Sequence, residues 1–275
     1  MGRVRTPSTV QYRTRAPCHK PFPKLSRVPV SGQGLKEIAR RLRVRDAAER
    51  MADSARLLVD TVSDPVYQPV RELGSRFDSA DRAAGTSSRW AAMLPVLTEL
   101  APASATDLGC NAGWFTLQLG RMGISTVGIE GHPPYYRTAL TAVRRSGLRN
   151  VAVMAVELTP ETLRLLPQVD CTLFLSVWHH LVRADGLDSA TEFLRQVWRH
   201  TDVVMFFETG EYEEFAGGVY NLPPMPPDAK SWLTEYLGSA CEHSQVIHLG
   251  QHPSGPGNPA TRNLFAVRRA SGPRE

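Results

Sequence analysis

The stretch DLGCNAGWFT at residues 107–116 decides the fold. It begins inside a short β-like run at 105–108 and leads into a segment with helical character. Small residues let a backbone loop approach a ligand closely, and glycine also permits positive φ. Asn111 stands where such loops often carry another glycine, and asparagine tolerates the left-handed conformation. The stretch therefore predicts a ligand-binding loop between a strand and a helix.

A carboxylate at the next strand end supports this interpretation. Glu130 follows the apolar run at 126–129 and lies 23 residues after Asp107. In nucleotide-binding α/β folds, an acid at this position accepts hydrogen bonds from ribose hydroxyls, because the second strand ends beside the glycine loop of the first. A dinucleotide enzyme uses the same crevice, but its usual spacing is G-x-G-x-x-G, which the glycines here match less well.

From Ala105 onward, β-like runs alternate with helical segments, which is typical of a parallel sheet covered on both faces. Predicted strands lie at 105–108, 125–130, 151–155, 170–176, 202–208, 244–249 and 262–268. Predicted helices lie at 114–121, 134–146, 160–166, 189–200 and 228–239. Only the turn-rich stretch 251–259 separates the last two strands, which predicts an antiparallel hairpin. We expect an α/β fold with a seven-stranded, mostly parallel sheet, helices on both faces and an antiparallel last strand.

Three regions are predicted along the chain. Residues 103–275 form the ligand-binding domain. Residues 34–102 form a helical lid or docking extension, with an amphipathic helix from Gly34 to about Thr61, a short helical stretch at 70–77 and a helix whose N-cap is Ser87 or Ser88. Residues 1–33 form a basic, disordered arm, because positions 1–36 hold eight Lys or Arg and no acid. Such an arm could contact RNA or an anionic membrane surface, or remain a solvated extension.

Composition argues against several classes of protein. No run approaches the roughly 20 apolar residues that cross a bilayer, so no stable membrane insertion is expected. The four cysteines include no C-x-x-C pair, so neither a zinc site nor a disulfide framework is predicted. These features favour a reducing, cytoplasmic location and metal-independent chemistry.

Residues 105–268 resemble the class I S-adenosylmethionine-dependent methyltransferases, whose first motif is similar to Asp107-x-Gly109-x-Asn111-x-Gly113. The resemblance implies S-adenosylmethionine as the methyl donor, with Asp107 near its methionine moiety, Glu130 at its ribose, and Glu157 with Leu158 near its adenine. An acid at the position of Glu157 can instead stabilise the next helix N-terminus. The residues expected to bind the donor are Asp107, Gly109, Cys110, Asn111, Gly113, Trp114, Phe115, Glu130, Gly131, Glu157, Leu158 and Ser176.

The fourth predicted strand ends in FLSVWHH at residues 174–180, where this family places acceptor-facing groups. A hydroxyl acceptor must lose a proton, and histidine suits that transfer because its pKa lies near physiological pH. His180 is the expected base and His179 its structural partner; the alternative is that both merely pack around the loop. Glu208, at the end of the fifth predicted strand, is expected to orient a histidine or to bind acceptor hydroxyls.

Three functions stay open. No Asn-Pro-Pro-Tyr or Asp-Pro-Pro-Tyr motif follows the fourth strand and no cysteine nucleophile lies in that loop, which favours methyl transfer to a hydroxyl oxygen of a sugar or other small molecule. The segments 174–180 and 220–237 are also distantly similar to a family acting on the tRNA wobble uridine, so RNA modification is the second hypothesis. The third is a non-catalytic module that only binds S-adenosylmethionine.

Overall fold

The computed structural model describes residues 68–77, 80–211, 222–255 and 258–270, together with the isolated positions 40, 51, 52 and 55. The chain divides into two units, 1–49 and 50–275, and the fold described here belongs to the second. The predicted basic arm at 1–33 and most of the predicted helix at 34–61 lie outside the described residues.

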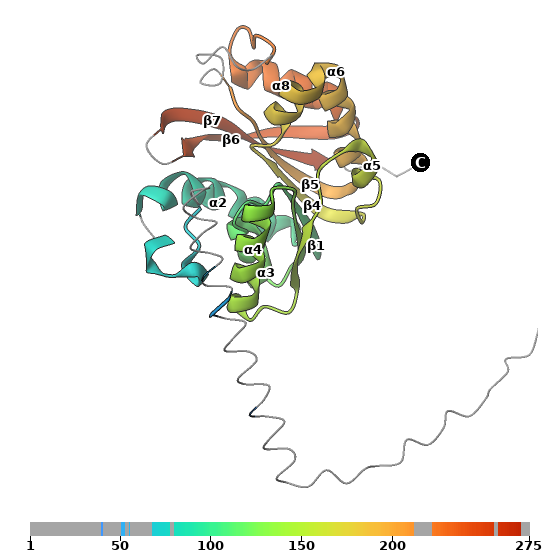
Figure 1. Cartoon of the computed structure of the whole chain (residues 1–275). Coiled ribbons are helices and arrows are strands. Elements are labelled where there is room, and N and C mark those ends of the chain that lie inside the picture. The colour runs from blue at the N-terminus through green and yellow to red at the C-terminus, as the bar shows by residue number, and fades with distance from the viewer. Residues whose placement is uncertain are drawn as a thin grey trace, which may run out of the picture. The chain divides into compact units, whose positions relative to one another are not determined.

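A seven-stranded sheet forms the centre of the second unit (Figure 1). Its strands in chain order are β1 (Ser104–Leu108), β2 (Ser125–Glu130), β3 (Val151–Ala155), β4 (Val169–Leu175), β5 (Thr201–Glu208), β6 (Ser244–Gly255) and β7 (Asn258–Arg269). The spatial order is β3-β2-β1-β4-β5-β7-β6. Pairing is parallel from β3 through β5, and β7 runs antiparallel to both of its neighbours. The predicted fold class is confirmed.

Helices cover both faces of this sheet (Figure 1). One face carries α5 (Pro160–Leu163), α6 (Trp178–Arg199) and α8 (Ala229–Ala240). The other carries α2 (Ala80–Leu100), α3 (Trp114–Arg121) and α4 (Pro133–Ser146), with the 3-10 turns η1 (Arg71–Leu73) and η2 (Ser75–Phe77) packed nearby. None of the helices in the described ranges is long and apolar enough to cross a membrane.

The two faces of the central strands separate the core into two clusters. Phe174 and Phe207 pack with α6 and α8, whereas Leu173 and Phe206 pack with α2 and α3. Successive side chains of a strand point to opposite faces, so strands buried on both sides read as nearly continuous apolar runs. This is why the bounds of β4 and β5 could be predicted to within one residue.

Two predicted boundaries are wrong: the start of helix α2 and the extent of the turn between β6 and β7. Helix α2 begins at Ala80, so Ser87 and Ser88 lie inside it and cap nothing. The Ser88 hydroxyl instead bonds to Nδ1 of His252 at 2.6 Å. The stretch 251–259 is largely strand, since β6 continues to Gly255 and β7 begins at Asn258. Proline at 253 is tolerated because β6 is an edge strand, where a missing N–H costs no ladder bond.

Helix α6 also starts earlier than predicted. It begins at Trp178, directly after β4, and the predicted segment 189–200 is only its second part. Gly186 has φ 83° and ψ 169°, so it interrupts the helix between the two parts. That break explains why the helical pattern could be recognised only after it.

Candidate active site

The loop between β1 and α3 is built from residues with positive φ. Gly109, Asn111 and Gly113 have φ of 69°, 53° and 82°. The N–H of Gly109 donates to the carbonyl of Ile129 at 2.9 Å, which ties the loop to β2. A Cβ at position 109 would lie 2.6 Å from Cγ2 of Val177, so only glycine fits there. The same contact shows that the segment after β4 lies against this loop.

Glu130 joins the loop to the turn after β2. Its Oε2 accepts a hydrogen bond from the N–H of Asn111, and its Oε1 accepts one from the N–H of His132, both at 2.8 Å. The side chain is buried. Each carboxylate oxygen can accept a second hydrogen bond, so Glu130 keeps capacity for the hydroxyls of a ligand. The structure thus brings together the loop and the acid that the sequence pattern paired.

An unpartnered atom in the loop indicates that a ligand completes it. Oδ1 of Asn111 is buried, and no hydrogen-bond donor reaches it among the described residues. A buried acceptor without a donor is costly, so native proteins rarely leave one unfilled. The loop therefore fits a ligand that brings donors of its own, as the ribose hydroxyls and ammonium of S-adenosylmethionine would.

Asp107 is buried at the end of β1, and its Oδ2 accepts a hydrogen bond of 2.6 Å from the hydroxyl of Thr116. Burial raises the pKa of Asp107 to about 7; the hydrogen bond from Thr116 opposes this and the nearby charge of Glu130 adds to it. Burial likewise raises the pKa of the Cys110 thiol well above its usual value. Cys110 is thus a neutral part of the loop, whereas Asp107 exchanges its proton near neutral pH.

Two of the predicted donor residues have side chains that belong to the core. Phe115 is buried in the cluster beneath α2, and Trp114 packs against it edge to face with ring centroids 5.0 Å apart. Their side chains are therefore used for packing. Only their backbone groups, at the start of α3, lie next to the loop.

Gln68 is a neighbour of the loop that sequence reasoning missed. Its Oε1 accepts a hydrogen bond from the N–H of Trp114 at 3.0 Å, and the side chain is buried. The first N–H groups of a helix have no partner within the helix, so a side chain from another segment can satisfy one. Gln68 lies 46 residues upstream, and no local pattern marks it.

The turn after β3 borders a cavity of about 450 Å³. Leu158 lines it together with residues from α5 and α6, namely Thr159, Pro160, Leu181, Asp185, Ser189, Ala190 and Phe193. A Cβ on Gly131 would lie 3.1 Å from Cα of Glu157, so this turn packs closely beside the turn that follows Glu130. Thr159, not Glu157, caps α5, and the Glu157 side chain is exposed.

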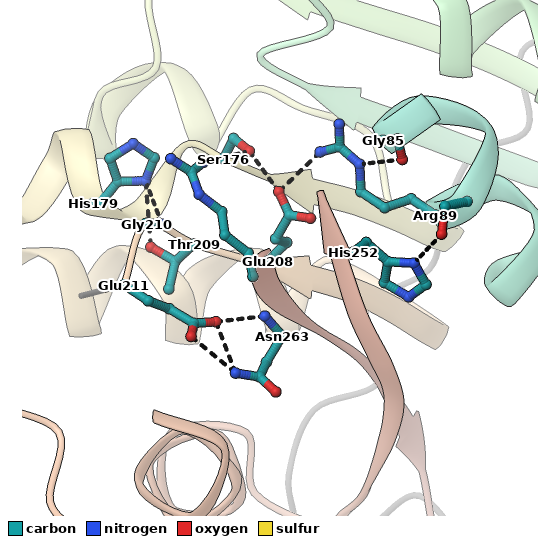
Figure 2. Close-up of polar contacts among 12 residues, drawn as sticks. Gly85, Arg89, Ser176, His179, Glu208, Thr209, Gly210, Glu211, His252 and Asn263 are labelled. Carbon is teal, nitrogen blue, oxygen red and sulfur yellow. Dashed lines mark hydrogen bonds and ion pairs between the residues drawn. The ribbon is translucent and has the colours of Figure 1, made fainter. Parts of the chain in front are cut away.

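A buried polar cluster lies at the ends of β4 and β5 (Figure 2). Ser176 has φ 57°; its N–H donates to the carbonyl of Glu208 at 2.9 Å, and its hydroxyl donates to Oε1 of the same residue at 2.7 Å. Arg89 from α2 donates to that Oε1 at 2.9 Å, and Arg262 from β7 donates to the Ser176 hydroxyl at 3.2 Å. Among the described residues, the hydrogen bonds of Glu208 are made with Ser176 and Arg89 and none is made with a histidine, so the geometry does not have Glu208 orienting His179 or His180.

The two histidines after β4 have different surroundings. His179 is buried, and its Nδ1 accepts a hydrogen bond from the N–H of Gly210 at 3.0 Å (Figure 2). Burial, followed by the charges of His180 and Arg262, lowers the pKa of His179 to about 2. Because a backbone N–H can only donate, neutral His179 carries its proton on Nε2. His180 is exposed, with its ring centroid 4.1 Å from that of His179.

The depressed pKa of His179 predicts how folding stability depends on pH. An unfolded chain takes up this proton below the ordinary value of 6.5, and the folded protein does not until about 2. The stabilising contribution is therefore complete above pH 6.5 and is lost as pH falls. His179→Asn keeps an acceptor for the Gly210 N–H but has no ring to protonate. We expect its free energy of unfolding, relative to that of the wild type, to rise by about 1.4 kcal/mol for each unit by which the pH falls below 6.

Urea unfolding of both proteins between pH 4 and pH 7 measures this difference. Asp107 contributes with the opposite sign, because its raised pKa favours the folded state at low pH and the contribution is lost as pH rises through about 7. That contribution is common to both proteins and cancels in the difference. Parallel stability curves would show that His179 is not held neutral.

Part of the chain is similar in sequence to known methyltransferases. Residues 106–202 match a family described as a methyltransferase domain. The O-antigen chain terminator bifunctional methyltransferase/kinase WbdD of Escherichia coli is 28% identical over 123 residues, which are 43% of this chain and 17% of that protein.

Solved structures show the same fold. Two structures of WbdD superpose with TM-scores of 0.58 and 0.57, at 20% and 22% identity, and each covers 77% of this chain and 46% of the WbdD chain. The magnesium protoporphyrin IX methyltransferase ChlM of Synechocystis PCC 6803, solved with bound SAH, superposes with a TM-score of 0.50 at 12% identity, over 70% of this chain and 88% of that one. This chain thus spans less than half the length of the WbdD chains.

The sheet order, the glycine loop and the acid after β2 define a Rossmann-like methyltransferase fold. The family match over residues 106–202 covers the loop, the acid and strands β2 to β4, and it supports a class I S-adenosylmethionine-dependent methyltransferase. S-adenosylmethionine is the methyl donor of this class.

Proposed function

We propose that this protein transfers a methyl group from S-adenosylmethionine to a hydroxyl oxygen of a sugar or other small molecule, with His180 as general base. One observation carries the proposal. The segment after β4 lies against the donor loop at Val177 and Gly109, and an exposed histidine follows three residues later. This closeness of the segment to the loop supports His180 as a proton acceptor near the donor.

The donor would be held by residues of the loop and by Glu130. Glu130 would accept hydrogen bonds from the ribose hydroxyls, and Oδ1 of Asn111 would receive a donor group of the ligand. Asp107, when ionised, would favour the positive charge of the methionine moiety, and Leu158 with Glu157 would border the adenine. When bound, S-adenosylmethionine supplies an activated methyl group, so the protein has to position the acceptor and remove its proton.

The division of work between the histidines follows from their surroundings. His179 would hold the residues that follow β5 in place through its hydrogen bond with the N–H of Gly210. Its low pKa makes it a poor base. His180 is exposed and would take the hydroxyl proton. The named activity of WbdD as an O-antigen chain terminator supports a glycan acceptor. The free buried thiols of Cys110, Cys171 and Cys241 support a reducing compartment such as the cytoplasm.

Transfer of tritium from S-adenosyl-[methyl-³H]methionine tests this function. The acceptors are methyl glycosides of common hexoses and deoxyhexoses, O-antigen polysaccharide released by mild acid, and total tRNA. We expect label on a hydroxyl of a glycan. Label only in tRNA would favour the RNA hypothesis instead, and binding of S-adenosylhomocysteine without transfer to any acceptor would favour the non-catalytic module.

A further inference from the structure

Arg89 of α2 and Glu208 at the end of β5 form a buried ion pair. The two side chains meet at 2.9 Å, and their side chains are only 5% and 0% exposed. Arg89 is fixed from two other directions, since its Nε donates to the carbonyl of Gly85 at 3.1 Å and its guanidinium lies 5.7 Å from the ring centroid of Phe115. Removing two charges from water is costly, so a buried pair alone is weak evidence of a stabilising role.

The carboxylate of Glu208 is satisfied on one side only. Both Arg89 and the hydroxyl of Ser176 donate to Oε1 (Figure 2). Oε2 is buried, and no donor reaches it among the residues that the structure describes. Leaving a charged acceptor unfilled is more costly than leaving a neutral one, so a donor from outside this set is needed.

The place of Glu208 in the fold favours the methyl acceptor as the source of that donor. Glu208 ends β5 and is bonded to Ser176, the first residue after β4. Ser176 adopts a positive φ that is unusual for a residue with a side chain, and such strain is concentrated at functional sites. Ser176 is only half-buried, so the cluster reaches the surface there, next to Val177 and the donor loop.

We propose that Oε2 of Glu208 receives a hydrogen bond from a hydroxyl of the methyl acceptor, and that Arg89 is the positioning residue that holds Glu208 for it. This inference rests on the proposed function. The interaction is a binding contact and involves no covalent step. Arg89 belongs to α2, outside the residues 106–202 that match the methyltransferase family. Helix α2 therefore takes part in choosing the acceptor.

Glu208→Gln separates a binding role from a structural one. The amide oxygen can still accept from Arg89 and Ser176, while an NH₂ group, which cannot accept, replaces Oε2. With the best glycan acceptor of the panel, we expect the KM to rise and kcat/KM to fall by about 10- to 100-fold, as loss of a hydrogen bond to a charged group implies. The affinity for S-adenosylhomocysteine should not change.

Arg89→Met should raise the same KM, and it should also lower the melting temperature because Glu208 is left without its cation. Adding Glu208→Gln to Arg89→Met should restore the melting temperature but not the KM. The control is Glu211→Gln: Glu211 is another buried carboxylate, but both of its oxygens accept from Nδ2 of Asn263. This control should lower stability and leave the acceptor KM unchanged.

A deoxy series tests the contact on the wild type itself, whether or not each variant folds. Among acceptors that each lack one non-reacting hydroxyl, one should lower the kcat/KM of the wild type by about 10- to 100-fold. With folded Glu208→Gln, the same acceptor should cause no further loss. An unchanged KM in folded Glu208→Gln, or a deoxy series without such a member, overturns this inference alone. A wild type that binds S-adenosylhomocysteine but methylates no hydroxyl overturns the proposed function and this inference with it.

Discussion

Replacing Glu130 with glutamine is expected to lower the affinity for S-adenosylhomocysteine by about 100-fold. The carboxylate accepts from the N–H groups of Asn111 and His132, so an NH₂ group at either oxygen would face a donor. The loop would shift, and a ribose hydroxyl would lose its charged acceptor. Titration calorimetry measures the affinity, and the melting temperature shows whether the variant is folded.

The matched control is Glu161→Gln. Glu161 is an exposed acid in the first turn of α5, and its replacement should leave S-adenosylhomocysteine binding unchanged. A folded Glu130→Gln that binds this ligand as tightly as the wild type would contradict the donor site described above.

Replacing His180 with alanine is expected to reduce kcat by about 100- to 10,000-fold, the usual contribution of a general base. The affinity for S-adenosylhomocysteine should not change, because the donor loop and Glu130 are untouched. Methyl transfer to the glycan acceptor measures kcat.

His200→Ala serves as the control, because His200 follows α6 at the opposite end and bonds to the carbonyl of Gln196. Its replacement should leave kcat unchanged. Unchanged turnover in His180→Ala, with a glycan acceptor that the wild type methylates, would remove His180 as the base and leave positioning as the main contribution of the protein.

The geometry of the loop at 107–113 and of Glu130 could be predicted from the sequence because its determinants are local. The loop at 107–113 needs residues that tolerate positive φ, and Glu130 directly ends the second strand. Both signals can be read within one strand-turn-helix unit. The predicted contact between them then follows from the parallel pairing of β1 and β2, which places their carboxyl ends side by side.

The polar contacts around Glu208 and His252 could not be predicted in the same way. Arg89 and Glu208 are 119 positions apart, and Ser88 and His252 are 164 apart. Contacts of this kind depend on how α2 and the β6–β7 hairpin pack, which no local pattern specifies. The adjacent His179 and His180 carry the same local signal, and only the packing of α6 on the sheet makes one buried and the other exposed.

Gly85 of α2 packs directly against Pro253 of the β6–β7 hairpin, and this contact limits how the protein can be engineered. A methyl group at this position would come within 2.4 Å of the backbone oxygen of Pro253, so helix and hairpin interlock without room for a side chain. Helix α2 and the hairpin therefore have to match each other in shape, although they are far apart in the sequence. A chimaera built to change substrate preference should transplant both together, since moving either alone would set an unmatched surface against this glycine.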